Sequence, residues 1–327
     1  MVNRFTFDGA LASPLRAAHA NSFPWLFGVS YAAVTSLGIL LLIFLSKDSF
    51  AAFADAIEML DQMDPDQVEL FTFLRMILGS FAPLFPWIVL GSFGAWVIWS
   101  VFQAASQRRY VRDERFFLRF GGDELRMMVV SLLWNVLQLV FTFVPIIIFL
   151  GGMLDVVALI LSGDDDPRLV GRVMTTMLMG GFLWLILFIA YVFFATRLAP
   201  CFALTIKERR ICFFDAWNVS RGRFWPILGA YLIWSIGGGM VVSVIDQILQ
   251  IPMGMLMMPH LDSLQTGEEL MTLVMSAGFL IPLFIYAFLR MFAAGLLMHA
   301  VAGPAAFAAR HDPRGSVDDK AMMGAFD

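Results

Sequence analysis

Long runs of apolar residues alternate with short charged segments along this chain of 327 residues. A helix that crosses a bilayer needs about 20 predominantly apolar residues. Six runs meet that requirement, and they lie at about 24–45, 83–105, 127–150, 174–197, 226–249 and 274–301. The pattern predicts an all-α integral membrane protein, in which a six-helix bundle forms a single membrane domain over 1–309 and a polar tail follows at 310–327.

The composition favours the same class of protein. Hydrophobic residues make up 60% of the chain, charged residues make up 15%, and the mean hydropathy is +0.79. Soluble domains have roughly 45–50% apolar and about 25% charged residues. No stretch is long, polar and patterned enough to predict a separate soluble domain.

The positive charges predict the orientation. Segments 1–22, 105–126, 197–225 and 303–327 together hold 17 Lys and Arg residues, whereas the segments 47–81, 162–172 and 257–270 hold 4. Cytoplasmic loops of membrane proteins carry the excess of Lys and Arg. Both termini are therefore predicted to be cytoplasmic.

The acidic segment that follows the first span is predicted to lie on the opposite side of the membrane. Apolar stripes at helical spacing run from Phe50 to Leu60 and from Val68 to Leu78, and they predict two helices on the outer surface. Asp66 with Glu69, and Thr266 with Glu269, have the spacing of a helix-capping box. Each pair predicts the start of a helix.

Each odd-numbered span is preceded by a charged, amphipathic segment on the predicted cytoplasmic side, at 1–22, 108–126 and 197–225. We call the last of these the elbow, and we expect such segments to form cytoplasmic amphipathic elbow helices. The apolar elbow residues Ile206, Phe213, Phe214 and Trp217 are expected in the lipid headgroup region. The three segments indicate either a threefold repeat of elbow and helical hairpin or a similar layout without a true repeat.

The elbow is also rich in positive side chains. Anionic lipid headgroups attract Lys and Arg near the membrane surface with about 1 kcal/mol for each residue. The candidate contacts to anionic lipid are Lys207, Arg209, Arg210, Arg221 and Arg223. The alternative is that these residues do no more than fix the orientation of the spans.

The elbow carries a recognisable sequence pattern: Arg197-Leu198-x-Pro200, an apolar strip, Ala216-Trp217, and then the run from Ser220 to Trp225 directly before a span. This pattern resembles a group of bacterial six-span membrane proteins that includes the membrane domain of some glycerophosphoryl diester phosphodiesterases and stand-alone, uncharacterised relatives. The specific likeness covers 197–230. The resemblance implies a bacterial inner-membrane location. It implies no phosphodiesterase activity, because these residues contain no soluble phosphodiesterase domain.

No residues in the sequence have the spacing of a catalytic or metal site. The four histidines, at positions 19, 260, 299 and 311, are scattered over both predicted sides of the membrane. Cys201 and Cys212 both lie in the elbow, where a reducing compartment disfavours a disulfide. Gly121-Gly122 lacks the context of a nucleotide-binding loop. We therefore expect no enzyme, no cofactor, no metal and no nucleic-acid partner.

Arg290 is predicted to lie deep within the sixth span, about 15 Å from its cytoplasmic end at ~1.5 Å per residue. Ionisable residues inside a membrane are functional candidates by default. Asn135 and Gln138 of the third span share that predicted depth, whereas Asp155 and Asp246 are predicted near the outer face. The candidate intramembrane polar site is therefore Arg290 with Asn135 and Gln138, and its role is either structural or a contact to a substrate or lipid.

Three consecutive glycines, Gly237 to Gly239, are predicted near the middle of the fifth span. A broken helix that lines a cavity is one interpretation, and close packing through small residues is the other. Two function hypotheses follow: a non-enzymatic membrane scaffold or lipid-organising protein, and a small-molecule or lipid transporter that uses the polar site around Arg290. Membrane lipids are the expected partners, and a protein partner or a second copy of the chain stays open.

Overall fold

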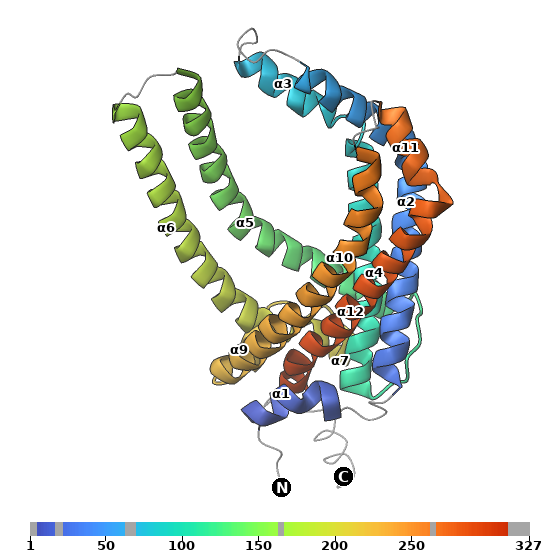
Figure 1. Ribbon diagram of the computed structural model, residues 1–327. Coiled ribbons are helices and arrows are strands. Elements are labelled where there is room, and N and C mark those ends of the chain that lie inside the picture. Colours follow the sequence, from blue (N-terminus) through green and yellow to red (C-terminus); the bar gives the residue numbers. More distant parts are fainter. Residues whose placement is uncertain (1–4, 17–21, 63–69, 163–166, 262–265, 313–327) are drawn as a thin grey trace, which may run out of the picture.

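The computed structural model describes residues 5–16, 22–62, 70–162, 167–261 and 266–312 (Figure 1). Within those ranges all regular secondary structure is helical, and six helices are long and apolar enough to cross a membrane, which confirms the six-span prediction. The elements are α1 (Phe7–Arg16), α2 (Phe23–Asp61), α3 (Leu70–Ser80), α4 (Phe85–Arg112), α5 (Gly122–Ser162), α6 (Pro167–Leu198), α7 (Cys201–Glu208), α8 (Ala216–Val219), α9 (Phe224–Leu232), the π-helical turn η2 (Ile233–Gly237), α10 (Gly238–Leu261), α11 (Gly267–Met275) and α12 (Ala277–Arg310).

The helices form two groups that meet at one end of the molecule (Figure 1). In the first group α12 packs against α2, α4 and α10. In the second group α5 and α6 form a hairpin that leans away, and α6 makes its main contacts with α5 and, near its own end, with α8 and α9. We call the shared end the base, and it consists of α1, α7, α8, the starts of α2, α5 and α9, and the ends of α4, α6 and α12.

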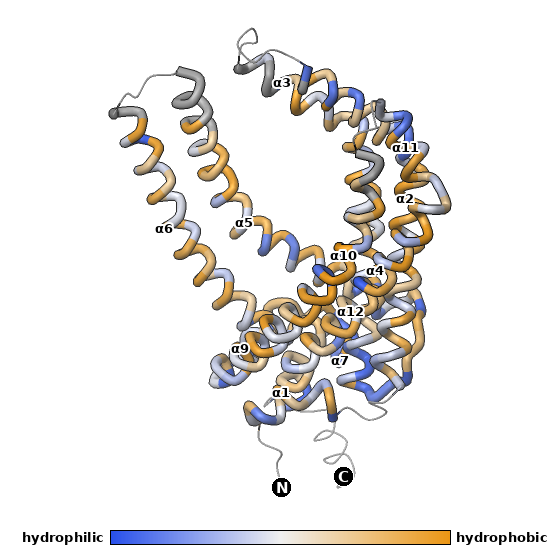
Figure 2. The backbone as a smooth tube through the Cα atoms, in the orientation of Figure 1, coloured by the Kyte–Doolittle hydropathy of each residue, from blue (hydrophilic) through white to orange (hydrophobic). Residues whose placement is uncertain are grey.

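The membrane helices carry their apolar side chains on the outside. Figure 2 shows hydrophobic residues along most of α6, and Leu178 of that helix is 72% exposed in the isolated chain. A soluble protein rarely exposes so large a contiguous apolar surface. Lipid therefore supplies the environment that these side chains lack within the chain.

The first long helix is one element and not two. The predicted first span and the first predicted surface helix are joined in α2, which has 39 residues without interruption. Between Leu45 and Asp61 there is no glycine or proline to end the helix. The outer half of α2 is held by α11, where the Gly267 N–H donates to Asp55 Oδ1 at 2.7 Å.

Several predicted helix starts can be compared with the structure. Thr266 Oγ1 accepts the Glu269 N–H at 3.2 Å, which confirms that cap, although it begins the short helix α11 and the chain bends at Ser276 before α12 starts. The second predicted surface helix corresponds to α3. Asp66 and the rest of its proposed cap lie outside the described residues.

The elbow is more deeply buried than predicted. Ile206 is 0% exposed and Phe213 is also buried, so these two residues belong to the interior of the base and not to a membrane surface. The other two apolar residues, Phe214 and Trp217, are exposed. The difference arises because α7 packs against α4, α5 and the end of α12, where Ala302, Ala305 and Ala306 allow close approach.

Candidate functional site

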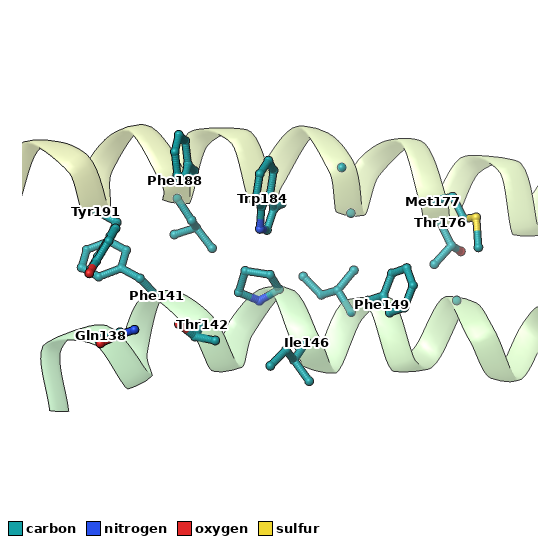
Figure 3. A pocket seen from close by; sticks show the side chains of 16 residues that line it. Gln138, Phe141, Thr142, Ile146, Phe149, Thr176, Met177, Trp184, Phe188 and Tyr191 are labelled. Carbon is teal, nitrogen blue, oxygen red and sulfur yellow. The ribbon is translucent and has the colours of Figure 1, made fainter. Parts of the chain in front are cut away.

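A groove lies between the two helices of the hairpin. Its volume is about 600 Å³, and it is lined along its length by side chains of α5 and α6. Figure 3 shows Trp184 of α6 extending toward α5 and the Phe149 ring of α5 between the two helices, and Phe188 of α6 also lines the groove. The wall is largely apolar and aromatic, which is typical of sites that bind apolar ligands.

Glycine and proline residues shape this groove. A Cβ atom added to Gly180 would lie 3.0 Å from Ile148 Cγ2, so the helices approach closely there. One residue later, a Cβ atom on Gly181 would meet nothing within 4 Å, because Gly181 lies against the open part of the groove. Pro145, which also lines the groove, removes a backbone hydrogen bond from α5, a helix that curves along its length (Figure 1).

Polar groups gather at the end of the groove nearer the base. Gln138 and Tyr191 lie together at that end, and Thr142 follows along α5 (Figure 3). Within the described part of the chain the Gln138 side chain forms no hydrogen bond, so its amide can bind a ligand. The groove therefore joins a long apolar wall to a small polar end.

A second polar group lies between α10 and α12. Asp246 Oδ1 accepts a hydrogen bond from the Tyr286 hydroxyl at 2.8 Å and forms an ion pair with Arg290, whose Nε lies 3.0 Å away. Its other oxygen, Oδ2, accepts from Gln250 Nε2 at 2.9 Å. The Arg290 side chain is nevertheless 46% exposed, so this ion pair is open on one side.

The predicted partners of Arg290 were wrong. The structure pairs Arg290 with Asp246, whereas Asn135 is exposed and Gln138 faces α6 in the groove. The error came from depth: α12 continues to Arg310 inside the base, so Arg290 lies 20 residues, or roughly 30 Å at ~1.5 Å per residue, from that end. Asp246 lies at a matching position on α10.

A pattern in the sequence could have revealed this site. Ser243, Asp246, Gln247 and Gln250 of α10 are spaced by three and four residues, which places polar side chains on one helix face within an apolar span. Tyr286 and Arg290 repeat the four-residue spacing on α12. The prediction considered single charges and not the stripe to which Asp246 belongs.

The glycine triplet has a packing role at one position. A Cβ atom on Gly238 would lie 2.3 Å from Leu297 Cδ1 of α12, whereas Gly237 and Gly239 have nothing within 4 Å. The packing interpretation is thus confirmed for Gly238. The π-helical turn η2 ends at Gly237, directly before this contact.

The basic residues of the elbow have different surroundings. Lys207 Nζ donates to the Ala309 carbonyl oxygen at 3.0 Å, and Arg223 donates to that of Ala308 at 3.4 Å. Arg210 forms an exposed ion pair with Asp215 at 3.0 Å. Arg209 and Arg221 are exposed, and neither side chain forms a hydrogen bond or ion pair within the described ranges.

Buried charges hold the base together. Arg108 of α4 forms an ion pair with Glu124 of α5, and both side chains are almost completely buried. Next to it, Asp123 accepts from Arg112 at 2.7 Å, from Arg119 at 3.1 Å and from Arg126 at 3.2 Å. Asp123 and Glu124 lie in the first turn of α5, where the helix dipole favours negative charge.

The described residues include no group of three or more His, Cys, Asp and Glu side chains that could hold a metal ion. His299 is buried, and its Nδ1 lies 2.8 Å from Ser106 Oγ. The His19 and His260 side chains lie outside the described set.

Comparison with known proteins finds no matching family model, no matching curated protein and no matching solved structure. What this protein does must therefore be inferred from its own residues.

Proposed function

We propose that this chain is a non-enzymatic, multi-pass protein of a bacterial inner membrane, with cytoplasmic termini, and that it organises membrane lipid by binding a lipid molecule in the α5–α6 groove. The groove is the observation that carries the proposal. Its volume of about 600 Å³ lies within the ~300–1,000 Å³ of typical ligand pockets, and its wall suits an acyl chain.

The polar end of the groove would supply the selectivity. An acyl chain in a bilayer is already out of water, so moving it into the groove gains little from the hydrophobic effect. Affinity must then come from close packing against the aromatic wall and from hydrogen bonds at the polar end. Gln138 and Tyr191 line that end, and they would bind the glycerol or ester oxygens of the lipid.

A substitution that fills the groove tests this function. Gly181→Phe places an aromatic ring in the groove without a backbone clash, because a Cβ atom there meets nothing within 4 Å. Gly151→Phe is the matched control, since Gly151 has the same free space but does not line the groove. Native mass spectrometry of the purified full-length protein should show bound phospholipid in the wild type and in Gly151→Phe, and a loss of at least one lipid in Gly181→Phe.

Equal lipid retention by Gly181→Phe and Gly151→Phe would contradict the groove as the binding site. A photoactivatable phospholipid gives a second measurement of the same site. Crosslinks should map to α5 and α6 and should be lost in Gly181→Phe alone.

Anionic headgroups would bind the base through the elbow. Arg209, Arg210 and Arg221 have exposed side chains, which supports this part of the proposal, whereas Lys207 and Arg223 donate to the end of α12. Changing the three exposed arginines to glutamine should reduce the enrichment of phosphatidylglycerol around the protein in mixed nanodiscs. Unchanged enrichment at low salt would exclude the contact, because screening is weakest there.

Transport is the second candidate, and the ion pair of Asp246 and Arg290 favours it. Ionisable groups within a membrane usually face the bundle interior or a water-filled cavity, and this pair is open on one side. If water reaches the polar stripe, a cysteine at Gln247 should react with a membrane-impermeant maleimide, and a cysteine at Val244 should not. No reaction at Gln247 would exclude a hydrated path.

A further inference from the structure

One buried arginine at the base forms no hydrogen-bonded ion pair with any described residue. The side chain of Arg109, near the end of α4, is 1% exposed, and neither of its terminal guanidinium nitrogens has a hydrogen-bond partner within the described residues. An isolated charge in a protein interior is strongly unfavourable. Native proteins leave few buried donors unpaired, and each such group calls for an explanation.

The preceding residue, Arg108, is also a buried arginine, but it has acceptors for its guanidinium. Arg108 forms an ion pair with Glu124 and donates to the Phe117 carbonyl oxygen at 3.2 Å. The two arginines are adjacent on α4, but they point to different neighbours. Among the described residues, Arg108 has acceptors for its guanidinium, whereas the terminal nitrogens of Arg109 have none within hydrogen-bond distance.

The groups around Arg109 are already engaged. Its guanidinium carbon lies 5.5 Å from the centre of the Phe23 ring. Ser106 Oγ is paired with His299 Nδ1 at 2.8 Å. Asp113 acts on Arg109 electrostatically, but its carboxylate accepts from Arg310 at 3.0 Å. None of these described groups forms a hydrogen bond with the terminal nitrogens of Arg109.

The aromatic ring under Arg109 belongs to the first residue of α2. This helix has 39 residues, and its N-cap residue, Ser22, forms no side-chain capping hydrogen bond. The first backbone N–H groups of a helix have no acceptor within the helix. In α2 these are the N–H groups of Phe23 and Trp25, because Pro24 has none. Ser22 and Trp25 are exposed, so this end of the helix can be approached from the membrane interface.

We propose that Arg109 and the first turn of α2 form a binding site for an oxyanion of the phosphate class. The planar guanidinium matches the geometry of a phosphate and can bind it through two parallel hydrogen bonds. The start of a helix attracts the same anion through its free N–H groups and its dipole. The phosphate belongs either to a lipid headgroup or to a free ion, and the site is separate from the α5–α6 groove.

The test uses lipid-stripped, full-length protein in a non-ionic detergent at constant ionic strength. Thermal unfolding is followed while inorganic phosphate is added in one series and short-chain phosphatidylglycerol in another. We compare the wild type with Arg109→Gln. Arg115→Gln is the matched control, because it removes the same charge from an exposed arginine that forms no ion pair within the described ranges.

The melting temperature of the wild type and of Arg115→Gln should rise by several degrees, and that of Arg109→Gln should not. A rise with inorganic phosphate identifies the free ion as a sufficient ligand, and a rise with phosphatidylglycerol alone identifies a lipid headgroup. No rise in either series would overturn the proposal, and so would an equal rise in Arg109→Gln. The groove variant Gly181→Phe should respond like the wild type, which separates this site from the proposed lipid site.

A second variant keeps the proposal testable if Arg109→Gln folds poorly. Arg109→Met removes an unpaired charge, so without an anion its melting temperature should equal or exceed that of the wild type. With saturating ligand the order should reverse. An equal loss of melting temperature in both conditions would show that Arg109 is required for packing alone, and it would contradict an anion site.

Discussion

The base buries both its apolar side chains and several of its charges, whereas the α5–α6 hairpin exposes most of its apolar side chains. In the base, Glu124 is 0% exposed and pairs with Arg108, while apolar residues such as Ile206 fill the space around them. In the hairpin, Leu178 and Phe182 are more than half exposed. The base is therefore packed like the interior of a soluble protein, with internal partners for charges such as Arg108 and Arg112, and the hairpin depends on lipid.

This difference determines which residues set the angle between the hairpin and the rest of the molecule. The membrane-spanning parts of α5 and α6 pack mainly on each other, and the hairpin otherwise contacts α4, α7, α8 and α9 (Figure 1). The angle of the hairpin is then decided at the base. Substitutions in the base should affect stability far more than those on the outer faces of the hairpin.

The largest effect is expected from the buried ion pair. Glu124→Gln leaves the Arg108 charge buried without its partner, and the breaking of such a pair costs about 3–5 kcal/mol. Glu114→Gln is the control, because Glu114 lies 3.6 Å from Arg108 and its side chain is 35% exposed. Thermal unfolding in detergent measures both. A loss for Glu124→Gln no larger than that for Glu114→Gln would remove the contrast between the two regions.

A pair of apolar substitutions compares the regions directly. Ile206→Ala in the base should lower the free energy of unfolding by about 2–5 kcal/mol, because it leaves a cavity in a packed interior. Leu178→Ala on the outer face of α6 should change it by no more than ~0.5 kcal/mol, since lipid or detergent fills the space. Chemical denaturation of the two variants gives the comparison. Similar losses would mean that the hairpin has packing partners beyond this chain.

The contact between α10 and α12 gives a smaller effect within the membrane region. Gly237→Ala should stabilise the helix by about 0.5–1 kcal/mol, because alanine restricts the unfolded chain. Gly238→Ala restricts the unfolded chain in the same way, but its new methyl group forces the flexible end of Leu297 to move. This variant should therefore be less stable than Gly237→Ala by about 1 kcal/mol. The two melting temperatures are compared, and equal values would contradict the close packing at Gly238.

The smallest effect concerns Cys212, in the elbow between the spans. Burial raises the pKa of the Cys212 thiol to about 11. A raised pKa stabilises the protonated, folded form, so this contribution is present below the ordinary thiol pKa of about 8.5 and is lost as the pH rises toward 11. Maleimide labelling of the folded protein at pH 8 should be much slower than after denaturation. Equally fast labelling would show that the elbow opens.

Local rules recovered the parts of the fold that depend on neighbouring residues. The six spans follow from the length of the apolar runs. The cap at Thr266 follows from its spacing to Glu269. These features need no information about distant parts of the chain.

The failures concern residues whose neighbours come from elsewhere in the chain. The partner of Arg290 is a carboxylate 44 positions earlier, and the depth of both residues depends on how far α12 extends into the base. The burial of Ile206 depends on the alanines at the end of α12, which are about 100 positions away. The groove could not be predicted, because it depends on the relative position of α5 and α6, and the sequence of one helix does not determine that position.

The sequence by itself determined that the chain forms six apolar helices, because the length and hydropathy of each run decide whether it can replace water by lipid. It also determined the cap of α11, because Thr266 lies three residues before Glu269. Tertiary structure alone decided that Arg108 has an ion-pair partner and that the terminal nitrogens of Arg109 have no hydrogen-bond partner among the described residues, although both residues are arginines and adjacent. The reason is that solvation is set by local composition, whereas the pairing of a charge is set by the atoms that packing brings within about 3 Å of it.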